Sequence, residues 1–240
     1  MKNAFDILLL IARPAAGKSE IIHYLKGLDD ATRLERFHLH PFEEIDDFPF
    51  LWTWFEEDEI LSRLGHPRLH SDGNGYFLYP YFWDVLIGRI NLEYSKKLRD
   101  DPTYHEHKTT ILEFSRGSEH GGYRRAFEHL SSLIAEHLSI LYVDVTWEES
   151  LRKNRKRFNP DRPDSILQHA LEDEKLERLY RETDWEEISS GDPQMIPIQG
   201  KNVPYVVFDN ADDVTTRGGD ALGNRLESCL AKLWKLSKQD

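Results

Sequence analysis

The sequence predicts an α/β fold of three layers, in which about five parallel strands form a sheet with helices on both faces. The first observation is a nearly aliphatic run, FDILLLI at residues 5–11, which is typical of a strand buried on both faces. The second is that later segments rich in β-branched and aromatic residues alternate with helical patterns, as in parallel βαβ units. The third is the length: 240 residues suit a single domain, 1–240, with insertions.

The first strand leads into ARPAAGKS at residues 12–19, which matches the phosphate-binding pattern G-x-x-x-x-G-K-[S/T] except that Ala12 replaces the first glycine. Ile21, Ile22 and Leu25 then have helical spacing, so the required helix follows the loop. We therefore predict a site for ATP or GTP with Mg²⁺, with Ser19 as a ligand of the metal. The nucleotide-binding residues of this loop are Arg13, Pro14, Ala15, Ala16, Gly17, Lys18 and Ser19. The alternative is an accidental strand-turn-helix with Lys18 on the surface.

The remaining elements follow from local patterns. Strands are predicted over residues 33–39, 109–114, 140–145 and 203–208. Helices are predicted over residues 82–97, 123–137, 148–157, 165–182 and 221–236. The strand over 33–39 has the most mixed composition, so we expect it near an edge of the sheet.

Residues 40–81 are predicted to form an insertion after the second strand. The segment contains Trp52, Trp54 and Phe55 and the turn-rich stretch 71–76. Ligands of open α/β sheets bind outside the carboxyl ends of the strands, so this insertion is placed to close over an acceptor substrate. A packed subdomain with an aromatic core is an equal alternative, and both can hold together.

Composition limits the classes of partner. The net charge of −12 argues against general nucleic-acid binding, which needs a basic surface. No segment has the length of apolar sequence that spans a bilayer, and the N-terminus does not resemble a signal peptide, so we expect a cytoplasmic protein that does not bind membranes. The single cysteine, Cys229, has no internal disulfide partner. A homo-oligomer is compatible with the sequence.

Three further motifs, together with the loop at 12–19, resemble those of the P-loop kinase group of the nucleoside-triphosphate hydrolase superfamily. EFSR at 113–116 resembles the E-R-S element of deoxynucleoside kinases with one residue inserted. The basic segment 147–157 after the strand that ends at Asp144 is similar to an arginine-bearing lid helix. FDN at 208–210 is similar to an adenine-side element, which adds Asn210 to the nucleotide-binding residues. The resemblance implies a P-loop fold that transfers the γ-phosphate to a small-molecule acceptor, with nucleosides and nucleotides first among the candidates.

Catalytic roles follow from what phosphoryl transfer needs, which is positioning and fixed positive charge. Lys18 is expected to bind the β- and γ-phosphates, and Glu113 to hold Mg²⁺ or its water shell and to pair with Arg116. A purely structural Glu113–Arg116 pair is the alternative. Arg152 and Arg155, ranked above Arg157, are expected to point from the predicted lid at 147–165 to the phosphates. The alternative is a solvated helix face that pairs with Glu148, Glu149 and Asp161.

The acceptor base is predicted among the carboxylates at 43–47, and Asp47 is the candidate we select. The sequence does not identify the acceptor or distinguish ATP from GTP. A different class of function also fits: a regulatory module that binds or hydrolyses the nucleotide without an acceptor.

Overall fold

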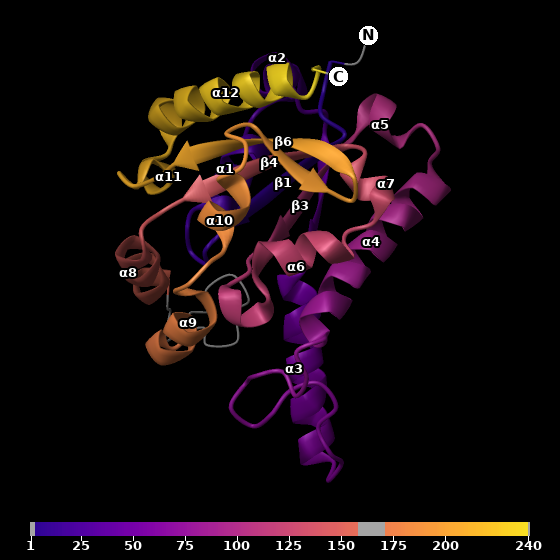
Figure 1. Cartoon of the computed structure of the whole chain (residues 1–240), viewed down its shortest axis with the longest axis vertical. Coiled ribbons are helices and arrows are strands. Elements are labelled where there is room, and N and C mark those ends of the chain that lie inside the picture. The colour runs from indigo at the N-terminus through magenta and orange to yellow at the C-terminus, as the bar shows by residue number, and fades with distance from the viewer. Residues whose placement is uncertain (1–2, 158–170, 240) are drawn as a thin grey trace.

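The computed structural model describes residues 3–157 and 171–239 and has an α/β fold built on one twisted sheet (Figure 1). The strand order is β2-β3-β1-β4-β6-β5. The strands are β1 (Ile7–Ala12), β2 (Phe42–Asp46), β3 (Thr109–Phe114), β4 (Leu138–Asp144), β5 (Met195–Ile198) and β6 (Lys201–Asp209). The first five in this order run parallel, and β5 pairs antiparallel with β6 at one edge. The predicted fold class is confirmed, and β5 is an additional strand that the sequence analysis missed.

The sheet lies between two layers of helices, as the side chains of β1 illustrate. Because side chains alternate along a strand, Ile7, Leu9 and Ile11 pack into one core cluster, whereas Leu8 and Leu10 pack into the other. The first cluster is covered by α4 (Phe82–Asp100), α6 (Gly122–His129), α7 (Ser132–Ala135) and α10 (Trp185–Ser189). The second is covered by α1 (Lys18–Lys26), α2 (Asp30–Phe37) and α12 (Gly219–Leu236). This arrangement is the predicted three-layer fold.

The predicted second strand over 33–39 is wrong, because these residues lie mostly in helix α2. Asp29 caps the helix by accepting a hydrogen bond from the Thr32 N–H, and Phe37 is buried from the last turn. The true second strand is β2, which pairs with β3 alone and lies at the other edge of the sheet. Its sequence FEEID is rich in acidic residues, so it lacks the apolar pattern that identifies a buried strand.

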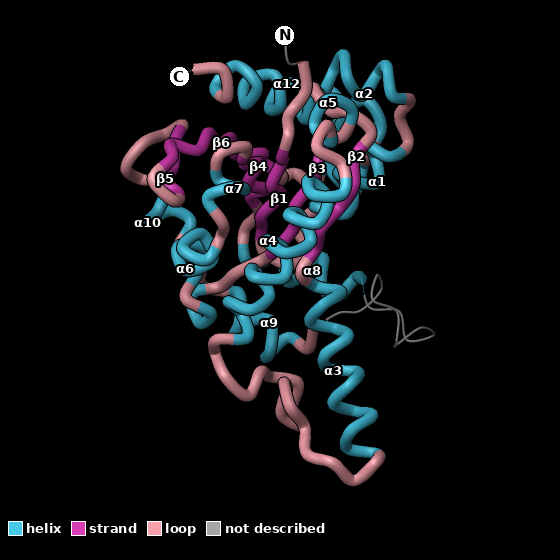
Figure 2. The backbone as a smooth tube through the Cα atoms, turned by 90° about the vertical axis from the view of Figure 1, so that its right-hand side faces the viewer, coloured by secondary structure: helices cyan, strands magenta, loops and turns pink. Residues whose placement is uncertain are grey.

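The insertion between β2 and β3 consists of α3 (Phe48–Arg63), an irregular loop, α4 and the short α5 (Tyr104–His107). Helix α3 extends away from the sheet in both views (Figures 1 and 2). The Trp54 ring of α3 packs against Phe77 of the loop and Phe82 at the start of α4. The fully buried Asp58 accepts hydrogen bonds from the N–H groups of residues 69–71, which fastens the loop to the helix.

The other helices follow the predictions with shifted boundaries. The predicted helix over 123–137 is divided into α6 and α7, because Leu130 is extended and Ser131 caps the second helix. Helix α8 covers Trp147–Arg157, α9 covers Asp173–Tyr180 and α11 covers Val214–Arg217. The first part of the predicted helix over 165–182 lies outside the described residues. Among the described helices, none is long and apolar enough to cross a bilayer.

Candidate active site

The chain between β1 and α1 turns at two residues with left-handed backbone conformations. Ala15 has a φ of 58° and Gly17 a φ of 113°. Gly17 is also required by packing, since a Cβ atom there would lie 2.5 Å from Thr215 Oγ1. Ala12, by contrast, is not among the described residues with positive φ. The missing first glycine of the motif therefore imposes no backbone strain.

Lys18 opens helix α1 and points toward the carboxyl end of β3. Its side chain is only 7% exposed, and its Nζ donates a hydrogen bond to Ser115 Oγ at 2.7 Å. The Glu113 carboxylate lies 3.7 Å from the same ammonium group. The structure thus brings the loop lysine and the predicted metal ligand together, with Ser115 as a third member that the sequence analysis did not assign. The signal for Ser115 was present in the EFSR motif.

Three carboxylates gather where β2 and β3 end. The parallel register places Asp46 opposite Glu113, and Asp47 follows directly at the start of α3. Burial raises the pKa of all three groups; the neighbouring carboxylates add to this for Asp46, and Arg116 opposes it for Asp47. Three buried carboxylates therefore share one end of the site, and further negative charge is disfavoured there.

The expected Glu113–Arg116 pair does not form among the described contacts, because Arg116 binds Asp47 instead. Arg116 Nη1 donates to Asp47 Oδ2 at 2.6 Å and to the Ser115 carbonyl at 2.8 Å. The guanidinium also lies over the Trp83 ring, 5.2 Å from its centroid, and is only 2% exposed. Arg116 therefore positions Asp47 and has no exposed surface for a ligand.

A cavity of about 840 Å³ joins the loop to these carboxylates. Its charged lining is divided between two ends. The loop, the start of α1, α8 and Thr216 form one end, which we call the nucleotide end; its acid is Glu20 and its cations are Lys18, Arg152, Lys153, Lys156 and Arg157. The ends of β2 and β3 with α3 and α4 form the other, which we call the acceptor end, and its acids are Glu44, Asp46, Asp47, Glu93 and Glu113.

Helix α8 contributes different residues from those predicted. Arg155 is absent from the described cavity lining, and its Nη2 pairs with Asp173 Oδ2 at 2.6 Å. Arg152 lines the cavity but is held by Glu149 at 2.6 Å and Asp213 at 2.8 Å. Arg157, which we ranked lower, lines the cavity with Nη2 3.5 Å from Ser19 Oγ. Of the predicted lid at 147–165, residues 158–165, including Asp161, lie outside the described part of the chain.

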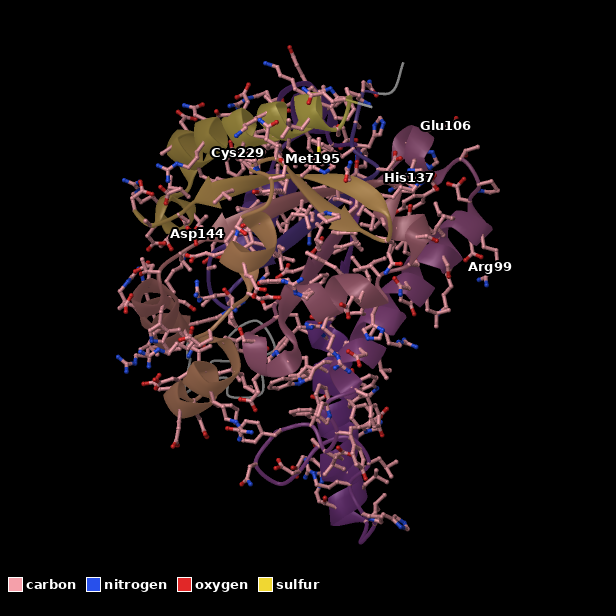
Figure 3. All side chains as sticks on the ribbon, viewed as in Figure 1. Arg99, Glu106, His137, Asp144, Met195 and Cys229 are labelled. Carbon is pink, nitrogen blue, oxygen red and sulfur yellow. The ribbon has the colours of Figure 1, made fainter. Side chains whose placement is uncertain are left out.

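Arg13 in the loop and Asn210 after β6 are both absent from the described cavity lining. Asn210 is fully buried, and its Nδ2 donates to the Ala16 carbonyl and to Thr215 Oγ1, each at 2.8 Å. Arg13 donates to the Val145 carbonyl at 3.2 Å, just beyond Asp144, which Figure 3 shows at the opposite end of β4 from His137. Asn210 thus stabilises the loop through the Ala16 carbonyl, and Arg13 joins the loop to the chain after β4; neither lines the predicted nucleotide site.

Lys153 and Thr215 complete this support; Lys153 lies in the basic segment 147–157, but neither residue was predicted in this role. Lys153 is 6% exposed and donates to Asp213 Oδ1 at 2.8 Å and to Thr215 Oγ1 at 3.0 Å. Thr215 in turn contacts the position of Gly17. Helix α8 is therefore linked to the phosphate-binding loop through buried polar groups.

No protein-family model matches this chain, and no curated protein matches it. Solved structures of small-molecule kinases do. A gluconokinase from Sinorhizobium meliloti has 13% identity and a TM-score of 0.46, with 98% of this chain and 99% of the other covered. A shikimate kinase from Acinetobacter baumannii, in complex with shikimate, has 12% identity and a TM-score of 0.41, with 99% and 97% covered. A sugar kinase from a Janibacter species has 13% identity and a TM-score of 0.40, with 97% and 96% covered. Similarity at these values assigns no activity to the chain.

Proposed function

We propose that this protein is a P-loop kinase that transfers the γ-phosphate of ATP, or of GTP, to a hydroxyl group of a small molecule. The observation that carries this proposal is the continuous cavity with cations at the nucleotide end and carboxylates at the acceptor end. Phosphoryl transfer needs fixed positive charge around the phosphates and a carboxylate within reach of the acceptor hydroxyl. The two ends of this cavity supply both requirements in one chamber.

The nucleotide end suits a triphosphate in geometry and charge. A loop with left-handed residues that leads into a helix directs backbone N–H groups toward an anion, and Ala15 and Gly17 have that conformation here. Lys18, Lys156 and Arg157 add positive charge to the same wall. The volume of about 840 Å³ falls within the usual range of ligand sites, roughly 300–1,000 Å³.

The two ends of the cavity each offer an oxygen ligand for the metal that accompanies a nucleotide. Mg²⁺ prefers oxygen ligands, and the Ser19 hydroxyl and the Glu113 carboxylate both line the cavity. When bound, the magnesium nucleotide supplies the transferable phosphoryl group and a divalent charge. Lys18, which contacts Ser115 and Glu113 in this structure, is our candidate for binding the γ-phosphate.

Asp47 is our candidate for the base that receives the acceptor proton. In the proposed reaction, the acceptor oxygen forms a bond to the γ-phosphorus while the bond from that phosphorus to the β,γ-bridging oxygen breaks. The hydroxyl proton passes to the carboxylate, and the nucleoside diphosphate leaves with the bonding electrons. Arg116 fixes one Asp47 oxygen at 2.6 Å, which leaves the other for the proton.

A second candidate function is a nucleotide-binding or hydrolysing regulatory module. One observation favours it: Arg152 and Arg155 are paired with carboxylates, so they are not directed at a phosphate in this structure. A kinase would need α8 to supply its positive charge through other residues. Lys156 and Arg157, which line the cavity, meet that need and support the kinase proposal.

The first experiment tests the nucleotide end. We expect Lys18→Met to weaken binding of a non-hydrolysable ATP analogue with Mg²⁺ by about 10- to 100-fold, the worth of a hydrogen bond to a charged group. The matched control is Lys26→Met in the same helix, because Lys26 is 55% exposed and pairs with Glu44. Calorimetric titration measures both affinities. Equal affinity for Lys18→Met and the unmodified protein would disprove the phosphate-binding role of the loop.

The second experiment separates the two candidate functions. The protein is incubated with labelled ATP and a panel of small hydroxyl compounds, and transfer of the label is compared with release of inorganic phosphate. A kinase transfers the label to an acceptor. Release to water alone, with the analogue still bound tightly, would support the regulatory module.

A further inference from the structure

The acceptor end of the cavity is lined by carboxylates, and its one described cation already has an ion-pair partner. Among the described lining residues, five carboxylates belong to this end, and Lys97 of α4 is its one cation. The Lys97 ammonium forms an ion pair with Glu43, and Glu43 does not line the cavity. An acidic ligand group entering this end would meet carboxylates rather than an available cation.

Arg116 is also not available to bind an acidic group of the acceptor. Guanidinium groups bind carboxylates and phosphates in a bidentate manner when their N–H groups are accessible. Three of the five N–H groups of Arg116 donate to Asp47 and to the carbonyls of Ser115 and Trp83. The side chain is 2% exposed, so it presents no surface to the cavity.

Among the described residues, Asp46 is the one carboxylate of the acceptor end without an ion-pair partner. It lines the cavity, accepts a hydrogen bond from the Phe48 N–H at 3.0 Å, and has no cation within ion-pair distance in the described residues. The nearby acids Glu44 and Glu93 pair with cations outside the acceptor end, at 2.7 Å to Lys26 and 2.8 Å to Lys96. Burial and the neighbouring carboxylates Glu113 and Asp47 raise the pKa of Asp46, so a further negative charge is disfavoured at this position.

We propose that the acceptor is a hydroxyl compound without a carboxylate or phosphate group, such as a sugar, polyol, amino sugar or nucleoside, and that the Lys97–Glu43 pair excludes acidic analogues. This inference rests on the proposed kinase function, whose acceptor class it narrows. A binding site can reject a wrong ligand by placing a side chain of the same charge beside it, or by leaving its charged group without a partner. The hydroxyl groups of a neutral or amine-bearing acceptor instead find several carboxylate oxygens that accept hydrogen bonds.

The test compares acceptors of one carbon skeleton that differ in charge: glucose, glucosamine, gluconate and glucose 6-phosphate, with a nucleoside and its monophosphate as a second matched pair. Label transfer from ATP is measured for each compound. We expect transfer to at least one neutral or amine-bearing member and faster turnover of these than of their acidic counterparts. Faster transfer to an acidic member would overturn this inference and leave the kinase function intact. Transfer to none would count against the kinase function itself, and with it this inference.

A charge variant tests the residue assignment. Glu43→Gln removes the partner of Lys97 and frees a cation at the cavity wall, so we expect kcat/KM for the acidic acceptors to rise about fivefold relative to the neutral ones. The control is Glu136→Gln, which removes the same charge from an exposed pair with Lys201. Equal changes in both variants would show that only net charge acts and would overturn the role of the pair.

Discussion

Arg116 Nη1 donates a hydrogen bond to Asp47 Oδ2 at 2.6 Å, and the two side chains are only 2% and 8% exposed. The pair joins the end of β3 to the start of α3, so it connects the sheet to the insertion. It also fixes the orientation of our candidate base. Buried ion pairs contribute little net stability, but removal of one partner leaves an uncompensated charge.

Arg116→Met should therefore lower the free energy of unfolding by about 3–5 kcal/mol, because Asp47 stays buried without its partner. The double variant Arg116→Met/Asp47→Asn should recover most of this loss, since it also removes the charge. Urea denaturation measures both. Lys201→Met, which breaks an exposed pair, serves as the control and should change stability by less than about 1 kcal/mol. A loss that the double variant does not reduce would contradict the pairing.

The arginines of α8 allow a matched comparison within one helix. Arg157→Gln should weaken binding of the ATP analogue about tenfold, because Arg157 lines the cavity beside Ser19. Arg155→Gln should change this affinity less than about twofold, since Arg155 is 62% exposed and pairs with Asp173. Calorimetric titration with Mg²⁺ decides the matter. The reverse order of effects would restore our sequence-based ranking of Arg155 above Arg157.

Local sequence signals predicted the central part of the fold well. The runs at 5–11, 109–114, 140–145 and 203–208 overlap the strands β1, β3, β4 and β6, because these inner strands are rich in aliphatic, β-branched and aromatic residues. The edge strand β2 carries FEEID and gave no such signal. The stretch at 33–39 was ambiguous, and the Asp29 cap, a local feature, settles it as a helix.

The candidate site divides in the same way. Lys18 and Glu113 were predicted together because each lies in a motif with a defined place in the fold. The partner of Arg116 was predicted as Glu113, three residues away, whereas the structure gives Asp47, 69 residues away. Contacts of this kind depend on the path of α3 and its loop, which no local pattern specifies. The support of the loop by Thr215 and Lys153 was missed for the same reason.

Glycine is required at the turn before α1 for two physical reasons that one substitution tests. Gly17→Ala places a Cβ 2.5 Å from Thr215 Oγ1 and forces a non-glycine residue to a φ of 113°. We expect a loss of about 2 kcal/mol in stability or more, together with weaker nucleotide binding. Gly73→Ala is the matched control, since a Cβ there meets no atom within 4 Å. Thermal denaturation that shows equal stability for the two variants would contradict the loop geometry.

Asp58 should make the insertion sensitive to acid. Although burial opposes ionisation, the hydrogen bonds from Leu69, Ser71 and His70 lower the pKa of Asp58 from 3.8 to about 2. A group whose pKa is lower in the folded state stabilises that state above its unfolded pKa and loses this contribution as the pH falls. We expect the free energy of unfolding to fall by about 2 kcal/mol between about pH 4 and pH 2.

Asp58→Asn tests this prediction, because it removes the charge and much of the pH dependence with it. The variant should be less stable at pH 7 by about 2 kcal/mol, and its difference from the unmodified protein should shrink toward pH 2. Hydrogen exchange of the amides at 69–71, which donate to Asp58, reports directly on the loop. Glu57→Gln on the exposed side of the same helix should leave both measurements unchanged. Unaltered protection of these amides in Asp58→Asn would show that the carboxylate does not hold the loop.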